Sequence, residues 1–191
     1  MDTVLIVSSA EKSVAVFREI LVPAFCENTV TAKSCSAARQ LLIKRGFDLV
    51  LINAPLTDES GEDLACHIAK NSGSEVILAV SGEHYEEISA AVEDYGVITV
   101  SKPLSRTLFW SALKMAKASH NRFQTLQREN NQLMKKIEDI RVVDRAKCVL
   151  IASLSMSENE AHRYIEKRAM NERTTKRRVA EQILKTYDGQ S

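Results

Sequence analysis

The sequence is poor in the residues and motifs that mark several protein classes. It contains 6 Gly and 3 Pro, which excludes collagen-like and proline-rich proteins. Its 4 Cys are scattered without a CxxC pair, so we expect reduced thiols and neither a disulfide framework nor a metal site. No apolar run approaches the ~18 residues that cross a bilayer, and the amino terminus lacks the basic region of a signal peptide. We therefore expect a cytoplasmic protein with no membrane partner.

Motifs typical of enzymes are also missing. The chain has no glycine-rich phosphate loop, no HExxH and no GxSxG. Ser8 and Ser9 follow the first apolar run, but no His or Lys obviously pairs with either hydroxyl as a base. We therefore expect no catalytic residues, no cofactor and no enzymatic activity.

Charge is unevenly distributed along the chain, although the formal net charge is only +1. Residues 1–105 contain 8 Lys or Arg and 15 Asp or Glu, whereas residues 106–144 contain 8 and 4. Residues 145–191 contain 10 and 6. An acidic front and a basic rear predict that any polyanion binds the C-terminal half.

Short apolar runs alternate with amphipathic stretches through the first hundred residues. The runs predicted as buried strands are Val4–Val7, Asp48–Ile52, Val76–Val80 and Val97–Val100. The stretches predicted as helices are Lys12–Val22, Ala37–Lys44, Asp63–Ala69 and Tyr85–Tyr95. Strands without polar alternation, separated by helices, are typical of a parallel sheet covered on both faces. We predict a doubly wound α/β domain with a five-stranded sheet.

A long helix without Gly or Pro is predicted next, and residues 106–144 are expected to serve as a coiled-coil linker. Its seam places Phe123, Asn130 and Ile137 at heptad position a, and Leu126, Leu133 and Ile140 at position d. Ile at a with Leu at d favours two parallel helices, and one Asn at a sets register and dimer state. We predict a homodimer; the alternative is one amphipathic helix that folds back on its own domain.

Residues 145–191 are predicted to form a small all-helical domain of three helices. The first, through Leu154, continues the long helix. A capping box formed by Ser157 and Glu160 opens the second helix. Thr174 is predicted as the N-cap of the last helix, which runs to about Tyr187.

Four short motifs occur in order within residues 1–118. They are Leu5–Ser9, Asp48–Asn53 followed by Gly61, Leu78–Ser81 and Val100–Pro103. In these motifs the segment resembles the receiver domain of two-component response regulators. The resemblance implies a phosphorylation pocket with two acidic residues, a phospho-accepting Asp, a hydroxyl and a Lys. The corresponding positions here hold Ser8, Ser9, Asn53, Ser81 and Lys102.

These departures predict a degenerate pocket. Mg²⁺ prefers charged oxygen ligands, and an amide oxygen is not a competent nucleophile toward a phosphoryl donor. We therefore predict a pseudo-receiver, in which Lys102 bonds to Asn53 or to a backbone carbonyl. Thr99 stands where many receivers carry an aromatic switch residue, and Glu11 is the carboxylate nearest in sequence to the first strand end.

A second set of motifs lies within residues 145–185. It comprises Arg145–Ile151, Ser157–Ile165, Arg168–Thr175 and Val179–Leu184. In these motifs the segment resembles the ANTAR domain, an RNA-binding module of transcription antiterminators. The resemblance implies a protein that binds a pair of hairpins in a nascent leader transcript and so prevents a terminator from forming.

The basic residues of this segment are compatible with phosphate binding and salt-dependent affinity, and Tyr164 is a candidate for stacking on an unpaired base. Lys167 and Lys185 belong to the same basic surface. The residues predicted to bind RNA are Lys147, Arg163, Tyr164, Arg168, Arg173, Lys176, Arg177 and Arg178. The alternative is a solvated charged face, with Tyr164 filling the small core.

Two other functions remain open from the sequence. One is a DNA-binding transcription factor of the response-regulator type, for which Thr174–Tyr187 is the candidate recognition helix. The other is an adaptor whose pseudo-receiver docks on a sensor or regulatory protein.

Overall fold

The computed structural model describes residues 1–21, 26 and 28–188 of the chain. They divide into two compact units, Met1–Thr125 and Leu126–Ser191. Within the described residues, no helix is both long enough and apolar enough to cross a membrane.

The first unit is built on a five-stranded sheet, as predicted. Its strands are β1 (Thr3–Val7), β2 (Asn28–Ala32), β3 (Leu49–Asn53), β4 (Glu75–Ser81) and β5 (Ile98–Lys102). They lie in the order β2-β1-β3-β4-β5 and all pair in parallel. β3 is buried along its whole length, which explains its uninterrupted apolar sequence.

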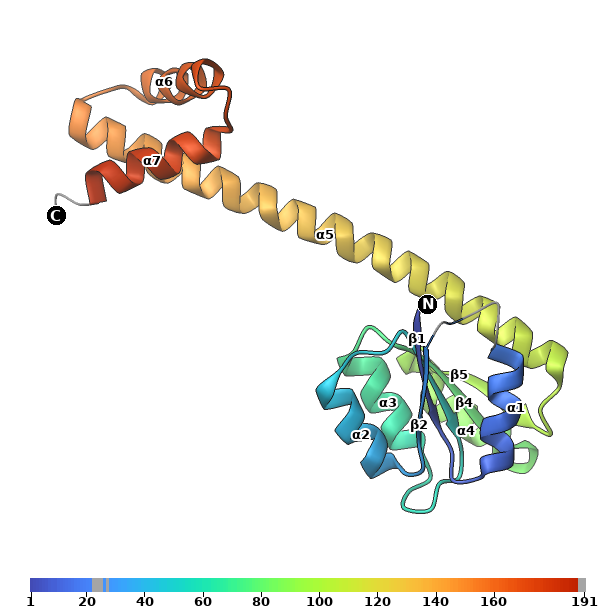
Figure 1. Ribbon diagram of the computed structural model, residues 1–191. Helices are drawn as coiled ribbons and strands as arrows, with labels where there is room; N and C mark the ends of the chain where they lie inside the picture. The colour runs from blue at the N-terminus through green and yellow to red at the C-terminus, as the bar shows by residue number, and fades with distance from the viewer. Residues whose placement is uncertain (22–25, 27, 189–191) are drawn as a thin grey trace. The chain divides into compact units, whose positions relative to one another are not determined.

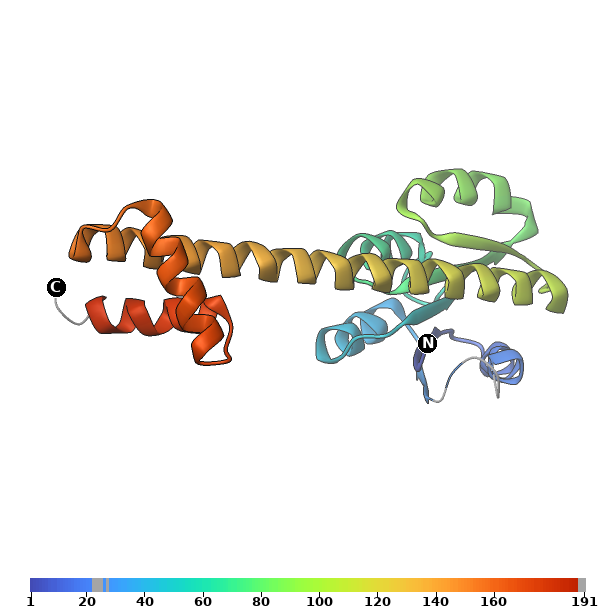
Figure 2. The same cartoon turned by 90° about the horizontal axis from the view of Figure 1, so that it is seen from above.

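Helices cover both faces of this sheet (Figures 1 and 2). They are α1 (Glu11–Leu21), α2 (Cys35–Lys44), α3 (Glu62–Asn71), α4 (Tyr85–Val92) and α5 (Arg106–Leu154), with short 3-10 turns at Gly82–His84 and Glu93–Tyr95. One face packs against α2, α3 and α4, and the other against α1 and the first turns of α5. On the second face the rings of Phe17 and Phe109 have centroids 5.3 Å apart. Val22, the predicted end of the first helix, lies outside the described residues.

The loop between β3 and α3 needs a glycine at position 61. Gly61 has a φ of +99°, a conformation that other residues rarely adopt. A Cβ at this position would also lie 3.1 Å from Cγ2 of Ile52. The same loop is fastened to α2, because Asp58 accepts hydrogen bonds of 3.0 Å from the backbone N–H groups of Cys35 and Ser36.

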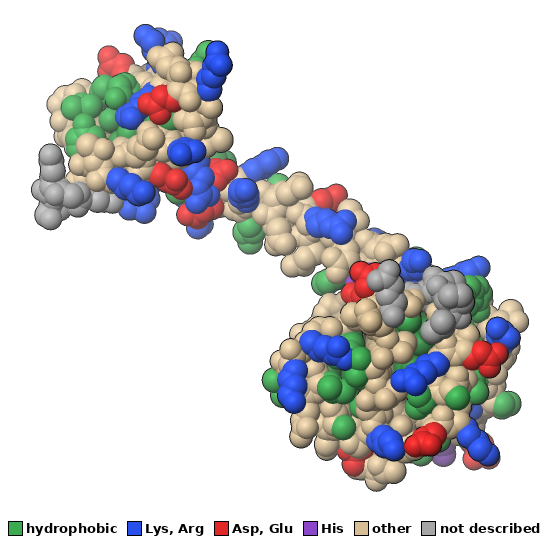
Figure 3. Space-filling model, viewed as in Figure 1, with side chains coloured by type: hydrophobic (Ala, Val, Ile, Leu, Met, Phe, Trp, Pro, Cys, Tyr) green, Lys and Arg blue, Asp and Glu red, His purple; other side chains and the backbone are tan. Residues whose placement is uncertain are grey.

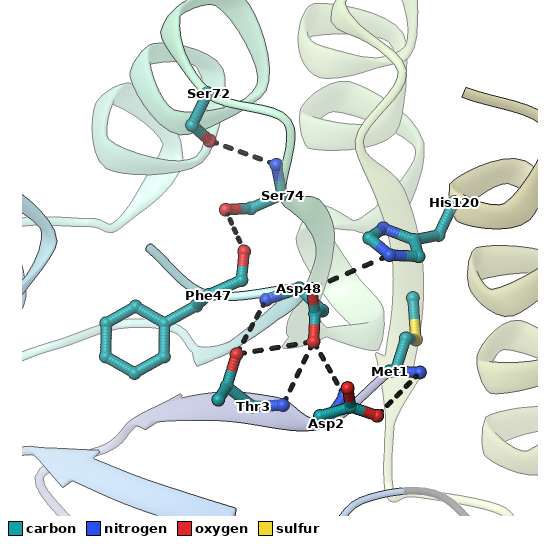
Figure 4. A network of polar contacts seen from close by, with 8 residues as sticks. All are labelled: Met1, Asp2, Thr3, Phe47, Asp48, Ser72, Ser74 and His120. Atoms are coloured by element: carbon teal, nitrogen blue, oxygen red, sulfur yellow. Dashed lines mark hydrogen bonds and ion pairs between the residues drawn. The ribbon is translucent and has the colours of Figure 1, made fainter. Parts of the chain in front are cut away.

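A polar network ties α5 to the amino edge of the sheet (Figure 4). Asp48 Oδ2 accepts hydrogen bonds from the backbone N–H groups of Asp2, at 2.6 Å, and Thr3, at 3.0 Å. Although burial alone would raise the pKa of Asp48, these donors lower it. Nε2 of the buried His120 lies 3.6 Å from Asp48 Oδ1. The ring of Phe123, one turn further along α5, lies against Gly73.

The second unit packs the end of α5 against α6 (Glu158–Asn171) and α7 (Lys176–Asp188) (Figure 1). Its core consists of small and branched residues: Ala146, Leu150, Ala161, Ile165, Ala169, Val179, Ala180, Ile183 and Leu184. The long helix α5 continues to Leu154, as predicted.

The two predicted helix starts in this unit have different outcomes. The capping box is confirmed, since Ser157 Oγ accepts from Glu160 N–H and the Glu160 carboxylate accepts from Ser157 N–H. The predicted N-cap at Thr174 is wrong by one residue. The backbone N–H of Arg178 donates to Thr175 Oγ1 at 3.3 Å, which makes Thr175 the capping residue.

Candidate nucleic-acid interface and receiver pocket

The carboxyl edge of the sheet gathers four of the five predicted pocket residues. Asn53, Ser81 and Lys102 are the last residues of β3, β4 and β5, and Ser8 directly follows β1. Ser81 and Lys102 are register partners on neighbouring strands. Ser9, the fifth predicted residue, is exposed at this edge.

Hydrogen bonds within this pocket join the side chains of Ser8, Asn53 and Lys102. Asn53, which is 8% exposed, donates through Nδ2 to Ser8 Oγ at 3.1 Å. Lys102 Nζ donates to Asn53 Oδ1 at 3.2 Å and also to the carbonyl of Ala54. The predicted local bonding of Lys102 is therefore confirmed. Burial lowers the pKa of this amine, as expected for an ammonium group with no carboxylate beside it.

The other residues considered for this pocket do not add charge to it. The Glu11 side chain is 87% exposed and lies 3.4 Å from Lys33 Nζ. Thr99 Oγ1 is buried and has no hydrogen-bond partner among the described residues. Among residues 1–21, 26 and 28–188, no group of three or more His, Cys, Asp or Glu side chains could hold a metal ion. The pocket offers hydroxyl, amide and ammonium groups, which is a poor set for a divalent cation.

In the helical unit, several predicted RNA-binding cations are paired with carboxylates. Arg177 donates to Asp139 on α5 at 2.6 Å and to Glu181 at 2.8 Å. The bond to Asp139 raises the pKa of Arg177 most, and the bond to Glu181 raises it further. Arg168 donates to Glu172 at 2.7 Å.

The two predicted lysines of this unit are paired in the same way. Lys176 is paired with Glu166. Lys147 lies 2.8 Å from Asp144 and 3.1 Å from Glu158, and its side chain is largely buried. Each of these four cations contacts a second helix of the unit, Arg168 through Gln182 of α7, and each has its charge locally neutralised by a carboxylate.

The other three cations predicted to bind RNA are exposed and are not paired with a carboxylate of the described residues. Arg163, Arg173 and Arg178 form no ion pair with any described residue. Arg173 has a φ of +48° and lies in the turn between α6 and α7. Tyr164 is 40% exposed, so it neither fills the core nor stands fully in solvent.

The structure adds apolar neighbours that the sequence had not singled out. Leu154 and Met156, at the turn between α5 and α6, line a surface groove together with Arg163, Tyr164 and Lys167. The i to i+4 spacing of Arg163 and Lys167 already placed these two cations on one helix face. The apolar side of the groove depends on the path of the turn, for which the sequence held no comparable signal.

Comparison with known proteins defines the class of both units. Residues 131–184 match the ANTAR domain. The α/β unit is similar to the signal receiver domain of an HD domain-containing protein from Pseudomonas fluorescens Pf-5, with a TM-score of 0.57 and 25% identity over 64% of this chain and 92% of that one. It shares its fold with a response regulator receiver domain protein from Clostridium thermocellum, with a TM-score of 0.56 and 16% identity over 66% and 99% of the chains. The chain therefore joins a receiver-like domain to an ANTAR domain.

A relative with a named role extends this result. The transcriptional regulatory protein PdtaR of Mycobacterium tuberculosis, strains CDC 1551 / Oshkosh and ATCC 25618 / H37Rv, is 27% identical over 139 residues. The match covers 73% of this chain and 68% of the relative. Together the matches support a transcriptional regulator with a receiver-like domain, and they point to regulators and not to enzymes. The ANTAR match begins at residue 131, inside the segment predicted as a coiled-coil linker.

Proposed function

We propose that the protein is a homodimeric antitermination regulator that binds paired hairpins in a nascent leader RNA through its ANTAR domain. The observation that carries this proposal is the pair of exposed cations, Arg163 and Lys167, which line a groove with Tyr164 and form no ion pair with a described residue. Such cations bind phosphates without first releasing another partner, and binding them displaces counterions from the RNA. A hairpin loop presents unstacked bases that an aromatic ring can contact.

The middle of α5 supports dimerisation. Leu126, Leu133, Ile137 and Ile140 lie on one stripe of this helix and are each between 45% and 60% exposed. Asn130 lies on the same stripe and is also exposed. The stripe has the heptad spacing of a parallel dimer, so we infer that a second copy of this chain covers it. Phe123 extends the spacing, but its ring already contacts the loop at Gly73.

Two ANTAR domains on one coiled coil would bind two hairpins of the same transcript. Once the first hairpin is bound, the second binds at a high effective concentration, which raises the affinity for the pair above that for either one. Holding both hairpins folded competes with any terminator that needs the same nucleotides. Antitermination follows from this competition and needs no catalytic step.

We further propose that the receiver-like domain is not switched by phosphorylation. Its carboxyl edge has Asn53 at the end of β3, hydrogen-bonded on one side to Ser8 and on the other to Lys102. The amide is a poor nucleophile, and among the residues that the structure describes no cluster of carboxylates lies beside it to hold Mg²⁺. This leaves docking of a protein or another non-covalent input as the means by which the domain would respond.

A DNA-binding role is less well supported by the described residues. The candidate recognition helix α7 buries Val179, Ala180, Ile183 and Leu184 against the rest of its unit. Its exposed face therefore spans only part of the helix, and Arg177 on that helix is engaged with Asp139 and Glu181.

A gel-shift titration tests the proposed function. The full-length protein is mixed with an RNA pool that carries two tandem stem-loops with randomised loops, and separately with duplex DNA of the stem sequence. We expect retention of the RNA at concentrations at which the DNA stays free, and weaker binding as salt rises. Arg173→Gln and Arg178→Gln should each reduce the salt slope by about 1.4–1.8, because each substitution removes two phosphate contacts from the dimer. Lys114→Gln, an exposed cation of the receiver-like unit, is the matched control. Equal retention of both nucleic acids would contradict the proposal.

A further inference from the structure

A groove lies beside the turn that joins α5 to α6. It has a volume of about 410 Å³, within the ~300–1,000 Å³ of small-molecule sites. Side chains that line it include Leu154, Met156, Glu160, Arg163, Tyr164 and Lys167. Figure 3 shows hydrophobic side chains next to Lys and Arg side chains on the viewed face of this unit. We name this feature the turn groove.

The apolar surface of the turn groove is accessible to solvent. Leu154 is 46% exposed and Tyr164 is 40% exposed, while Met156 is half-buried and packs against the core of the unit. A Tyr side chain has only two side-chain torsions, so ordering its ring against a flat ligand costs little conformational entropy.

The charges around the groove favour an anionic ligand with a flat apolar part. Arg163 and Lys167 are one helical turn apart on α6, and neither forms an ion pair with a described residue. Glu160 is the acidic residue of the lining, and its carboxylate is bound by the N–H and hydroxyl of Ser157, each at 2.8 Å. These hydrogen bonds lower the pKa of Glu160, so it remains a charged cap of α6. Two free cations flanking an aromatic ring are the combination that binds single-stranded nucleic acid.

We propose that the turn groove receives one unstacked base of the hairpin loop. The base stacks on Tyr164, and the phosphates on either side of it lie at Arg163 and Lys167. The paired cations Arg168, Lys176 and Arg177 keep a structural role. This inference rests on the proposed function, because it names the part of the hairpin that this surface recognises.

Crosslinking tests the location of the base directly. The full-length protein is irradiated with a pool of stem-loop RNAs that contain 4-thiouridine at randomised loop positions, and crosslinked peptides are mapped by mass spectrometry. We expect a nucleotide attached within the peptide that contains Arg163, Tyr164 and Lys167. Crosslinks confined to other parts of α6 or to α7 would overturn the assignment.

Affinity measurements separate this inference from the proposed function. Tyr164→Leu should weaken stem-loop binding by about 5- to 100-fold, whereas Tyr164→Phe should stay within about 3-fold of the original protein. Neither variant should change binding to a blunt RNA duplex of the same stem. Lys114→Gln, an exposed cation of the receiver-like unit, is again the control, and circular dichroism confirms that Tyr164→Leu folds.

Two negative results have different meanings. If the original protein prefers stem-loops but Tyr164→Leu binds them equally well, the turn groove is the wrong site and the proposed function stands. If the original protein shows no preference for stem-loops over duplex RNA, both proposals fall.

Discussion

Replacing Leu133 by Ala on the α5 stripe should weaken a dimer of this protein by a measurable factor. Leu133 is 58% exposed in the single chain, so a partner helix could cover about half of its surface. Full burial of a Leu side chain is worth about 1.5–3 kcal/mol. Covering the exposed part therefore contributes roughly 1 kcal/mol per chain and roughly 2 kcal/mol per dimer. The dissociation constant should rise about 30-fold.

Sedimentation equilibrium over a range of protein concentrations measures this change. Gln132→Ala is the matched control, since it removes an exposed side chain next to the stripe on the same helix. Asn130→Leu should have the opposite effect on stability and should allow assemblies larger than two, because the polar residue that the dimer would bury no longer restricts the register. A monomer at every concentration for the original protein, or equal dissociation constants for Leu133→Ala and Gln132→Ala, would refute the reasoning.

Three further outcomes follow from the described contacts. Acetyl phosphate or beryllofluoride with Mg²⁺ should leave the intact mass and the spectra of the protein unchanged; a phospho-adduct would contradict the pseudo-receiver. Ser157→Ala should lower the free energy of unfolding of the helical unit by about 1 kcal/mol in urea titrations, because it removes the capping bond to Glu160 N–H. Asp58 has a pKa of about 2, lowered from 3.8 mainly by the N–H donors of Ser36 and Cys35. Its contribution to stability is therefore present above about pH 4 and lost as the pH falls toward 2, so Asp58→Asn should flatten this acid limb in pH-dependent melting.

The buried part of the fold was predictable because burial and sequence pattern are closely linked in it. β1, β3 and β4 are continuous apolar runs, since helices cover both of their faces. No residue range was predicted for β2, although a fifth strand was expected. Its sequence from Asn28 to Ala32 contains two Thr and one Asn, and only Ala32 is buried. As an edge strand that pairs only with β1, it needs little apolar surface, so hydrophobicity could not reveal it.

The receiver pocket was predictable from a topological rule. Parallel strands that end at one edge bring their last residues together, and this places Asn53, Ser81 and Lys102 side by side. The loss of acidic residues left Lys102 without a charged partner, so a bond to Asn53 and to a backbone carbonyl was the expected compensation. The unpartnered Thr99 hydroxyl depends on local packing and could not be expected from the sequence.

The basic surface was less predictable, because charge can be counted in a sequence but pairing across helices cannot. The i to i+4 pairs of Arg168 with Glu172 and of Arg177 with Glu181 follow from helical spacing. The contact between Arg177 and Asp139 joins residues 38 positions apart and depends on how α7 packs against α5. For this reason Arg177 was predicted as an RNA ligand, although its guanidinium is held by two carboxylates.

This division of the cations has a consequence for salt dependence. A paired guanidinium must give up a carboxylate before it binds phosphate, so it displaces little net counterion, whereas an unpaired one contributes fully. Four cations form no ion pair with any residue that the structure describes: Arg163, Lys167, Arg173 and Arg178. They amount to about eight phosphate contacts per dimer, so the logarithmic salt slope should be roughly −6 to −7. If the paired cations of α5, α6 and α7 also bound phosphate, the contacts would double and the slope would be steeper than about −11. A binding titration at several salt concentrations therefore distinguishes a surface in which the ion pairs persist from one in which RNA opens them.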